Sequence, residues 1–170
     1  MKLKIISVIG YSGSGKTNFI TTAIKFLKEN LKFNVAVVKN IKHHQIDEKG
    51  KDSNKFSEAG ASYSVIRNEK NEFAIFFKNE EIRLEELFKW LENGPFKLDI
   101  VITEGFRNLN QPTVLCSSNL KEIKEQLSEN VKMISGVICS KDNSNKKILD
   151  LPIIDINSHF SRFLDIFGIK

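Results

Sequence analysis

The sequence predicts an α/β fold with three layers, in which a mostly parallel central sheet carries helices on both faces. Short apolar runs rich in β-branched residues alternate along the chain with segments of helical periodicity. The run at residues 4–9 leads through a glycine-rich segment into an amphipathic stretch and then into a second apolar run at residues 33–39. A strand–helix–strand order of this kind indicates parallel strands joined by a right-handed crossover.

The apolar runs are predicted to be strands. In chain order they cover residues 4–9, 33–39, 62–68, 72–77, 98–106, 112–117, 134–140 and 151–156. The runs at 4–9 and 98–106 are almost continuously apolar, as expected for strands that are buried on both faces. The runs at 62–68 and 72–77 are separated only by "EKN", which favours a hairpin.

The helices are predicted from apolar side chains that recur on one face. The first begins at Lys16, a short second one covers residues 54–60, and the third ends at Gly94-Pro95. The apolar faces of the four longer helices contain Phe19, Ile20, Ala23, Ile24 and Leu27; Leu84, Leu87, Phe88 and Leu91; Leu120, Ile123 and Leu127; and Phe160, Phe163, Leu164 and Phe167. The polar stretch at residues 40–54 is expected to be a functional or disordered loop.

Length and composition favour one cytoplasmic domain over residues 1–170. The chain has 170 residues, enough for a single core, and a net charge of +5. Its Lys/Asn-rich blocks are expected to be solvated loops, with a surface that attracts an anionic ligand as the alternative. Cys116 and Cys139 have neither metal-ligand spacing nor a disulfide pattern. We expect no nucleic-acid partner and no membrane association, because the sequence contains no nucleic-acid motif, signal peptide or long apolar span.

The glycine-rich segment "GYSGSGKT", residues 10–17, fits the phosphate-loop pattern G-x-x-x-x-G-K-[ST] between a strand and a helix. Glycines let successive backbone N–H groups converge on phosphate oxygens, and the helix N-terminus adds further free N–H groups. Lys16 is expected to neutralise the outer phosphates, and the Thr17 hydroxyl to bind Mg²⁺. The residues predicted to contact the nucleotide here are Gly10, Ser12, Gly13, Ser14, Gly15, Lys16, Thr17 and Asn18.

A carboxylate for Mg²⁺ is expected after a neighbouring strand, because ligands of open α/β sheets bind outside the carboxyl ends of the strands. Glu104 ends the run at 98–106 on that side, whereas Asp99 lies at its far end. We therefore predict that Glu104 holds Mg²⁺ directly or through water, with a solvated turn acid as the alternative. Arg107 is a candidate for stabilising phosphate charge, and a surface salt bridge is an equal alternative.

The sequence resembles the family of molybdopterin-guanine dinucleotide biosynthesis protein B (MobB), within the P-loop NTPase superfamily. The resemblance rests on "GYSGSGKT", "VVKNIKHHQIDEKGKDS", "EAGA" and "LDIVITEGF", and it covers about the first two thirds of the chain. It implies a dimeric protein that binds GTP and Mg²⁺ and has weak GTPase activity. It also implies a partner guanylyltransferase, MobA-like, that joins GMP to molybdopterin.

The lysine- and histidine-rich loop matches that family less closely. Either Lys39 or Lys42 corresponds to the family's lysine, and Asp52 is carried over as a carboxylate in or near the Mg²⁺ site. His43 and His44 with Asp47 suggest a metal site, although a basic, solvated or phosphate-facing loop is the plainer interpretation.

The segment "SKDN" only partly resembles a guanine-reading motif. Asp142 is the candidate for accepting the guanine N–H donors, and a loop acid without a role is the alternative.

Two further functions remain open from the sequence. A small-molecule or nucleotide kinase usually has a lid with several arginines, whereas Arg67, Arg83, Arg107 and Arg162 are widely spread here. A nucleotide-binding adaptor that does not hydrolyse its ligand is the other possibility. The favoured hypothesis is a GTP-binding accessory protein of molybdenum cofactor synthesis.

Overall fold

The computed structural model describes residues 3–41, 46–77, 83–140 and 147–170. The chain folds into two compact units. The first contains residues 1–40 and 94–170, and the second contains residues 41–93. The expectation of a single domain over the whole chain stays a prediction.

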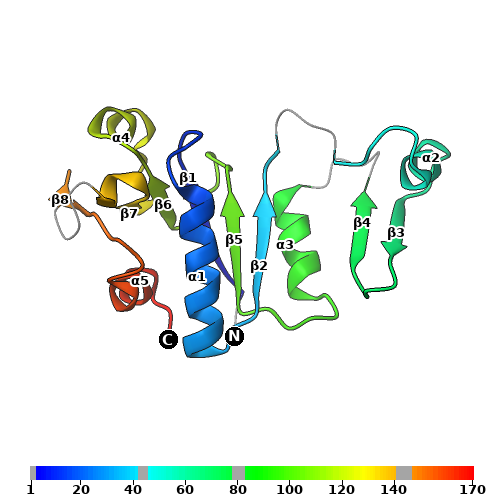
Figure 1. Cartoon of the computed structure of the whole chain (residues 1–170), viewed down its shortest axis with the longest axis horizontal. Helices are drawn as coiled ribbons and strands as arrows, with labels where there is room; N and C mark the ends of the chain where they lie inside the picture. The colour runs from blue at the N-terminus through cyan, green and yellow to red at the C-terminus, as the bar shows by residue number, and fades with distance from the viewer. Residues whose placement is uncertain (1–2, 42–45, 78–82, 141–146) are drawn as a thin grey trace. The chain divides into compact units, whose positions relative to one another are not determined.

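The first unit is built on a five-stranded parallel sheet (Figure 1). In spatial order its strands are β2 (Val35–Lys39), β5 (Ile100–Glu104), β1 (Lys4–Ile9), β6 (Thr113–Cys116) and β7 (Val131–Ser135). The central strands are almost wholly buried, because their continuous apolar runs face helices or loops on both sides. All five strands end on one side of the sheet, which we call the carboxyl edge.

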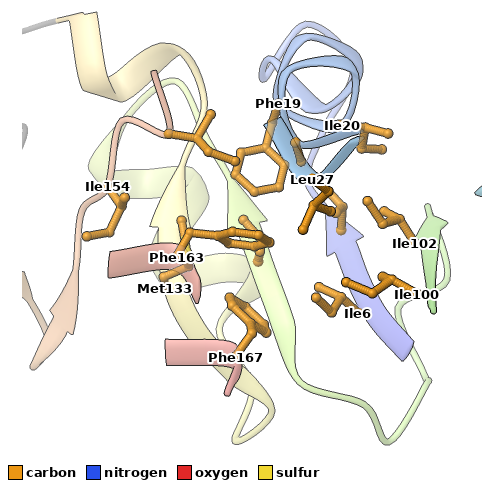
Figure 2. Packing of buried hydrophobic residues seen from close by; sticks show 14 of the residues in the cluster. Ile6, Phe19, Ile20, Leu27, Ile100, Ile102, Met133, Ile154, Phe163 and Phe167 are labelled. Atoms are coloured by element: carbon orange, nitrogen blue, oxygen red, sulfur yellow. The ribbon is translucent and has the colours of Figure 1, made fainter. Parts of the chain in front are cut away.

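Helices cover both faces of this sheet. On one face, α1 (Lys16–Leu31) and α5 (Phe160–Phe167) share a core in which the rings of Phe19 and Phe163 meet edge to face, 5.8 Å apart. Figure 2 shows these two rings with Phe167 and Met133 beside them. On the other face, Ile123 of α4 (Leu120–Gln126) packs in a second cluster with Leu115. This arrangement is the predicted three-layer α/β fold.

The second unit contains an antiparallel hairpin and two helices. The hairpin pairs β3 (Tyr63–Arg67) with β4 (Phe73–Phe77), as predicted. The short helix α2 (Asp52–Glu58) precedes it and begins two residues earlier than expected. The helix α3 (Leu84–Glu92) follows, and its Trp90 packs against Phe77 with ring centroids 5.7 Å apart.

The C-terminal part of the first unit differs from the prediction in two places. The expected strand at 134–140 is wrong in position: β7 ends at Ser135, and Val137–Ser140 forms a 3₁₀ helix, η1. Gly136, with φ of 91°, turns the chain out of the sheet. The expected strand at 151–156 is reduced to β9 (Leu151–Pro152), which pairs with β8 (Lys147–Ile148).

Candidate functional site

The phosphate loop lies at the carboxyl edge between β1 and α1. β1 ends at Ile9, and α1 begins at Lys16 directly after Gly15, whose φ of 93° only glycine adopts readily. The amide of Phe19 donates to the Gly15 carbonyl at 2.9 Å, which starts the helical hydrogen-bond ladder. The earlier amides of the first turn have no helical partner of their own, as at any helix N-terminus. The predicted strand–loop–helix context of the motif is therefore confirmed.

Two close approaches hold this loop against the neighbouring strands. A Cβ on Gly10 would lie 2.2 Å from the Cys116 carbonyl oxygen, and one on Gly136 would lie 2.2 Å from the Ser14 carbonyl oxygen. The amide of Val137 donates to that same Ser14 oxygen at 3.1 Å. Both positions therefore require glycine. The phosphate-loop motif includes Gly10, whereas sequence reasoning missed Gly136; the only signal was a glycine inside the apolar run at 134–140.

Lys16 and Ser14 give the loop its capacity to bind an anion. The Lys16 ammonium donates to the Tyr11 carbonyl oxygen at 2.8 Å, so that its charge lies across the loop. The Ser14 hydroxyl is buried and has no hydrogen-bond partner among the described residues. A buried hydroxyl without a partner is unfavourable, and a phosphate oxygen is a suitable acceptor for it. The residues of the loop thus fit the phosphate group that the motif implies.

Tyr11 is a further contact point that the motif leaves unspecified. The guanidinium carbon of Arg107 lies 5.0 Å from the centroid of the Tyr11 ring, a cation–π contact. The Tyr11 hydroxyl donates to Glu125 Oε2 at 3.2 Å. Arg107 is therefore positioned beside the phosphate loop, although its role toward phosphate stays a prediction. No pattern in the sequence pointed to Tyr11.

Glu104 ends β5 beside the phosphate-loop strand. It pairs in register with Val8 of β1 and with Lys39 of β2. The Glu104 side chain is 11% exposed, and its Oε1 lies 3.5 Å from Lys39 Nζ. A carboxylate this well covered needs a cationic or hydrogen-bonding partner. The carboxyl-edge position is as expected, whereas sequence reasoning did not foresee the ion pair with Lys39.

The remaining predicted residues are less constrained. Ser12, Gly13, Thr17 and Asn18 are exposed on the loop and the first turn of α1. Asp52 belongs to the second unit, where its carboxylate lies 3.2 Å from Lys55 Nζ. Lys42, His43, His44 and Asp142 lie outside the described residues. Their predicted roles, and that of Asp52, stay predictions.

Other ionisable groups show no second centre. Within residues 3–41, 46–77, 83–140 and 147–170, no three His, Cys, Asp or Glu side chains group as metal ligands. Asp47 instead accepts a hydrogen bond from Ser53 Oγ at 2.7 Å. Burial raises the pKa of the Cys116 and Cys139 thiols, which keeps both protonated. In the described part of the chain, no helix is both long and apolar enough to span a bilayer.

Comparison with known proteins identifies the family. The family model described as MobB, molybdopterin guanine dinucleotide synthesis protein B, matches residues 5–140. The chain belongs to the MobB family. The span shared with MobB contains the phosphate loop, Lys39, Glu104 and Arg107, whereas Asp142 lies just beyond it.

Individual relatives agree with this assignment. A molybdopterin-guanine dinucleotide biosynthesis adapter protein of Haemophilus influenzae is 25% identical over 158 residues, covering 92% of this chain and 83% of that protein. A protein assigned to the same adapter class in Methanocaldococcus jannaschii is 30% identical over 137 residues, covering 78% of this chain. The match spans 54% of that archaeal protein, so the chain corresponds to about half of its length.

The fold also agrees with a solved MobB structure. The crystal structure of Bacillus subtilis MobB superposes with a TM-score of 0.70 at 22% identity, and the match covers 99% of each chain. At this identity the likeness establishes the fold alone. The described part of the chain therefore shares the fold of MobB.

Proposed function

We propose that the chain is a GTP-binding adapter protein of molybdopterin guanine dinucleotide synthesis, with weak GTPase activity. The observation that carries the proposal is the loop between β1 and α1: it contains a buried Ser14 hydroxyl without a partner among the described residues, and the Lys16 ammonium lies across it. Membership of the MobB family supplies the pathway, because relatives are named as adapter proteins of this synthesis.

Mg²⁺ would be held by Thr17 and Glu104 together with phosphate oxygens. Both residues belong to the carboxyl edge, and hydroxyl and carboxylate oxygens are suitable ligands for this ion. Bound Mg²⁺ neutralises phosphate charge, while Lys16 and the loop amides orient the phosphates. No residue described around the phosphate loop is placed as a strong general base, so slow hydrolysis is expected.

The partner in this proposal is a molybdenum cofactor guanylyltransferase, which attaches GMP to molybdopterin. The word adapter in the relatives' names supports a role beside another enzyme. Molybdopterin, the acceptor of GMP, is a further candidate ligand of the chain. A cytoplasmic location follows from this pathway role and forms part of the proposal.

Self-association through the second unit is also part of the proposal. One face of the hairpin carries Tyr63, Val65, Arg67, Phe73, Ile75 and Phe77. We call this set the hairpin face. Its five apolar or aromatic members are 41–64% exposed, which is unusual for a continuous patch on a monomer. A second copy of the chain, presenting the same patch about a twofold axis, would cover these side chains in a homodimer.

The decisive experiment combines binding with reconstitution. Calorimetry with GTP and ATP, with and without Mg²⁺, should show binding of GTP and poor binding of ATP. Adding the chain to guanylyltransferase, molybdopterin and GTP should raise the yield of the guanine dinucleotide, measured by chromatography. Equal affinity for GTP and ATP would contradict the guanine assignment, and an unchanged yield would contradict the adapter role.

Measurements of GTP hydrolysis and of phosphate transfer distinguish the proposed function from the two alternatives. Single-turnover hydrolysis of GTP, measured with and without the partner, distinguishes a weak GTPase from an adaptor that only binds. Transfer of the γ-phosphate to an added pool of small-molecule acceptors would instead indicate a kinase. Neither alternative is favoured by a contact in the described residues.

A further inference from the structure

The ion pair between Lys39 and Glu104 is fixed by the backbone of the sheet. The two residues face each other as the last pair of the parallel β2–β5 ladder. Just beyond it, the Asn40 amide donates to the Glu104 carbonyl oxygen at 2.9 Å, and the Gly105 amide donates to the Val8 carbonyl oxygen at 3.0 Å. The strand ends of β2, β5 and β1 are thus tied together, which keeps the Lys39 side chain within reach of the carboxylate.

The two partners of this pair differ in their access to water. Lys39 is 53% exposed and Glu104 only 11% exposed. The Lys39 ammonium can be hydrated when it leaves the pair, because Lys39 is the exposed partner. The carboxylate cannot follow it into solvent and would be left without a counter-charge. The departure of Lys39 therefore destabilises the protein unless another cation takes its place at Glu104.

We propose that Lys39 is a tethered cation that occupies the metal-binding side of Glu104 in the nucleotide-free protein and is displaced when Mg²⁺ arrives with the nucleotide. This inference rests on the proposed Mg²⁺–nucleotide site. It also assigns a role to Lys39, whose partner side chain is the same carboxylate that the metal needs.

The consequence of this exchange is an order of binding. In the described parts of the chain, Glu104 belongs to no group of three or more His, Cys, Asp or Glu side chains that could hold a metal ion. A divalent ion without such a ligand cluster binds weakly, and a lysine ammonium beside the carboxylate weakens its binding further by like-charge repulsion. Phosphate oxygens add the missing ligands, so that metal displaces Lys39 only when nucleotide is present.

The test measures metal binding without any catalytic readout. Mn²⁺ is titrated into the nucleotide-free chain, and the free ion is followed by electron paramagnetic resonance. Lys39→Met keeps the aliphatic stem and removes the charge, so Mn²⁺ should bind roughly tenfold more tightly than to the wild type. The gain should disappear in the Lys39→Met/Glu104→Gln double variant, and Lys39→Arg should behave like the wild type.

A matched control removes the same charge elsewhere. Lys25 is an exposed lysine on α1, and Lys25→Met should leave Mn²⁺ affinity unchanged. Thermal unfolding in the presence of a chelator gives a second measurement: Lys39→Met should lower the midpoint, and Mn²⁺ should restore it, but not in the double variant. A purely structural salt bridge predicts the loss of stability without the metal rescue.

Two results would overturn the inference. One is an unchanged Mn²⁺ affinity in Lys39→Met. The other is a gain that persists after Glu104 is replaced by glutamine. Because the titration contains no nucleotide, its outcome is independent of GTP binding. If Lys39→Met binds Mn²⁺ tenfold more tightly but the chain fails to bind GTP, the inference about Lys39 stands and the proposal of GTP as the nucleotide is refuted.

Discussion

Lys16 is the residue whose substitution tests the phosphate loop most directly. Its ammonium donates to the Tyr11 carbonyl oxygen and lies across the loop rather than in the core. In Lys16→Ala we expect GTP affinity, measured by calorimetry, to fall at least about tenfold, because a charge-assisted contact to phosphate is lost. The thermal midpoint should change little. Wild-type affinity in this variant would show that the loop does not bind phosphate.

Gly136 is predicted to be required for the conformation of the phosphate loop, like the motif glycine Gly10. Gly136→Ala would place a Cβ 2.2 Å from the Ser14 carbonyl oxygen, and a contact that short forces the loop to move. We expect unfolding free energy to fall by about 2–4 kcal/mol in chemical denaturation, together with a loss of nucleotide affinity.

Gly50 supplies the control for this substitution. Its φ is 92°, close to the 91° of Gly136, yet a Cβ on Gly50 meets no atom within 4 Å. Gly50→Ala therefore reports the cost of the backbone conformation alone, about 1 kcal/mol. Equal losses in the two variants would mean that the contact with Ser14 is unimportant.

Among the secondary-structure elements, β3 and β4 expose the apolar hairpin face, which a partner is expected to cover. Val65 and Ile75 are directly cross-strand neighbours at its centre, with exposures of 53% and 41%. Val65→Glu should convert a dimer into a monomer, because a charge in the middle of an apolar interface would be desolvated without a partner. Light scattering coupled to gel filtration measures the mass.

A charge change outside the hairpin face is the control for that experiment. Lys70 lies in the turn between β3 and β4 and is exposed, so Lys70→Glu should leave the mass unchanged. A wild-type chain that is already monomeric at micromolar concentration would contradict self-association through this face.

The elements that could be predicted from sequence are those with a strong local pattern. β1 and β5 were recognisable because their apolar runs are nearly continuous, and the phosphate loop because its motif lies between a strand and a helix. β7 was placed too late because Val131 and Met133 flank an exposed Lys132, so that the run looked polar at its start. The following segment, Val137–Ser140, is apolar like a strand, so it was included in the expected strand although it forms a 3₁₀ helix.

Some contacts of the candidate site could not be predicted from local sequence patterns, because they join segments that are distant in the sequence. The Lys39–Glu104 pair depends on β2 lying next to β5, two strands separated by the whole second unit in sequence. The contact of Gly136 with Ser14 likewise joins distant segments. Such contacts follow from the sheet order, which alternation of strands and helices alone does not specify.

At the scale of the whole molecule, the sheet core depends on the last helix. Phe163 is fully buried and contacts Phe19, Phe160 and Phe167 through ring pairs. Phe163→Ala should cost about 3–5 kcal/mol and lower the thermal midpoint by roughly 6–20 °C in calorimetry. Phe96 is 78% exposed, so Phe96→Ala should have an effect within about 0.5 kcal/mol. Similar midpoints for the two variants would show that α5 contributes little to the core.

The attachment of the phosphate loop to distant strands also bears on biosynthesis. The loop is translated before its partner segments, yet its carbonyl at Ser14 is held by the amide of Val137, and Gly10 lies against Cys116. At about 5–20 residues per second, translation reaches Val137 roughly ten seconds after the loop. During that interval a nascent chain on the ribosome carries the complete motif without the contacts that shape it, so the loop reaches its final conformation only after Cys116 and Val137 have been made and have folded against it.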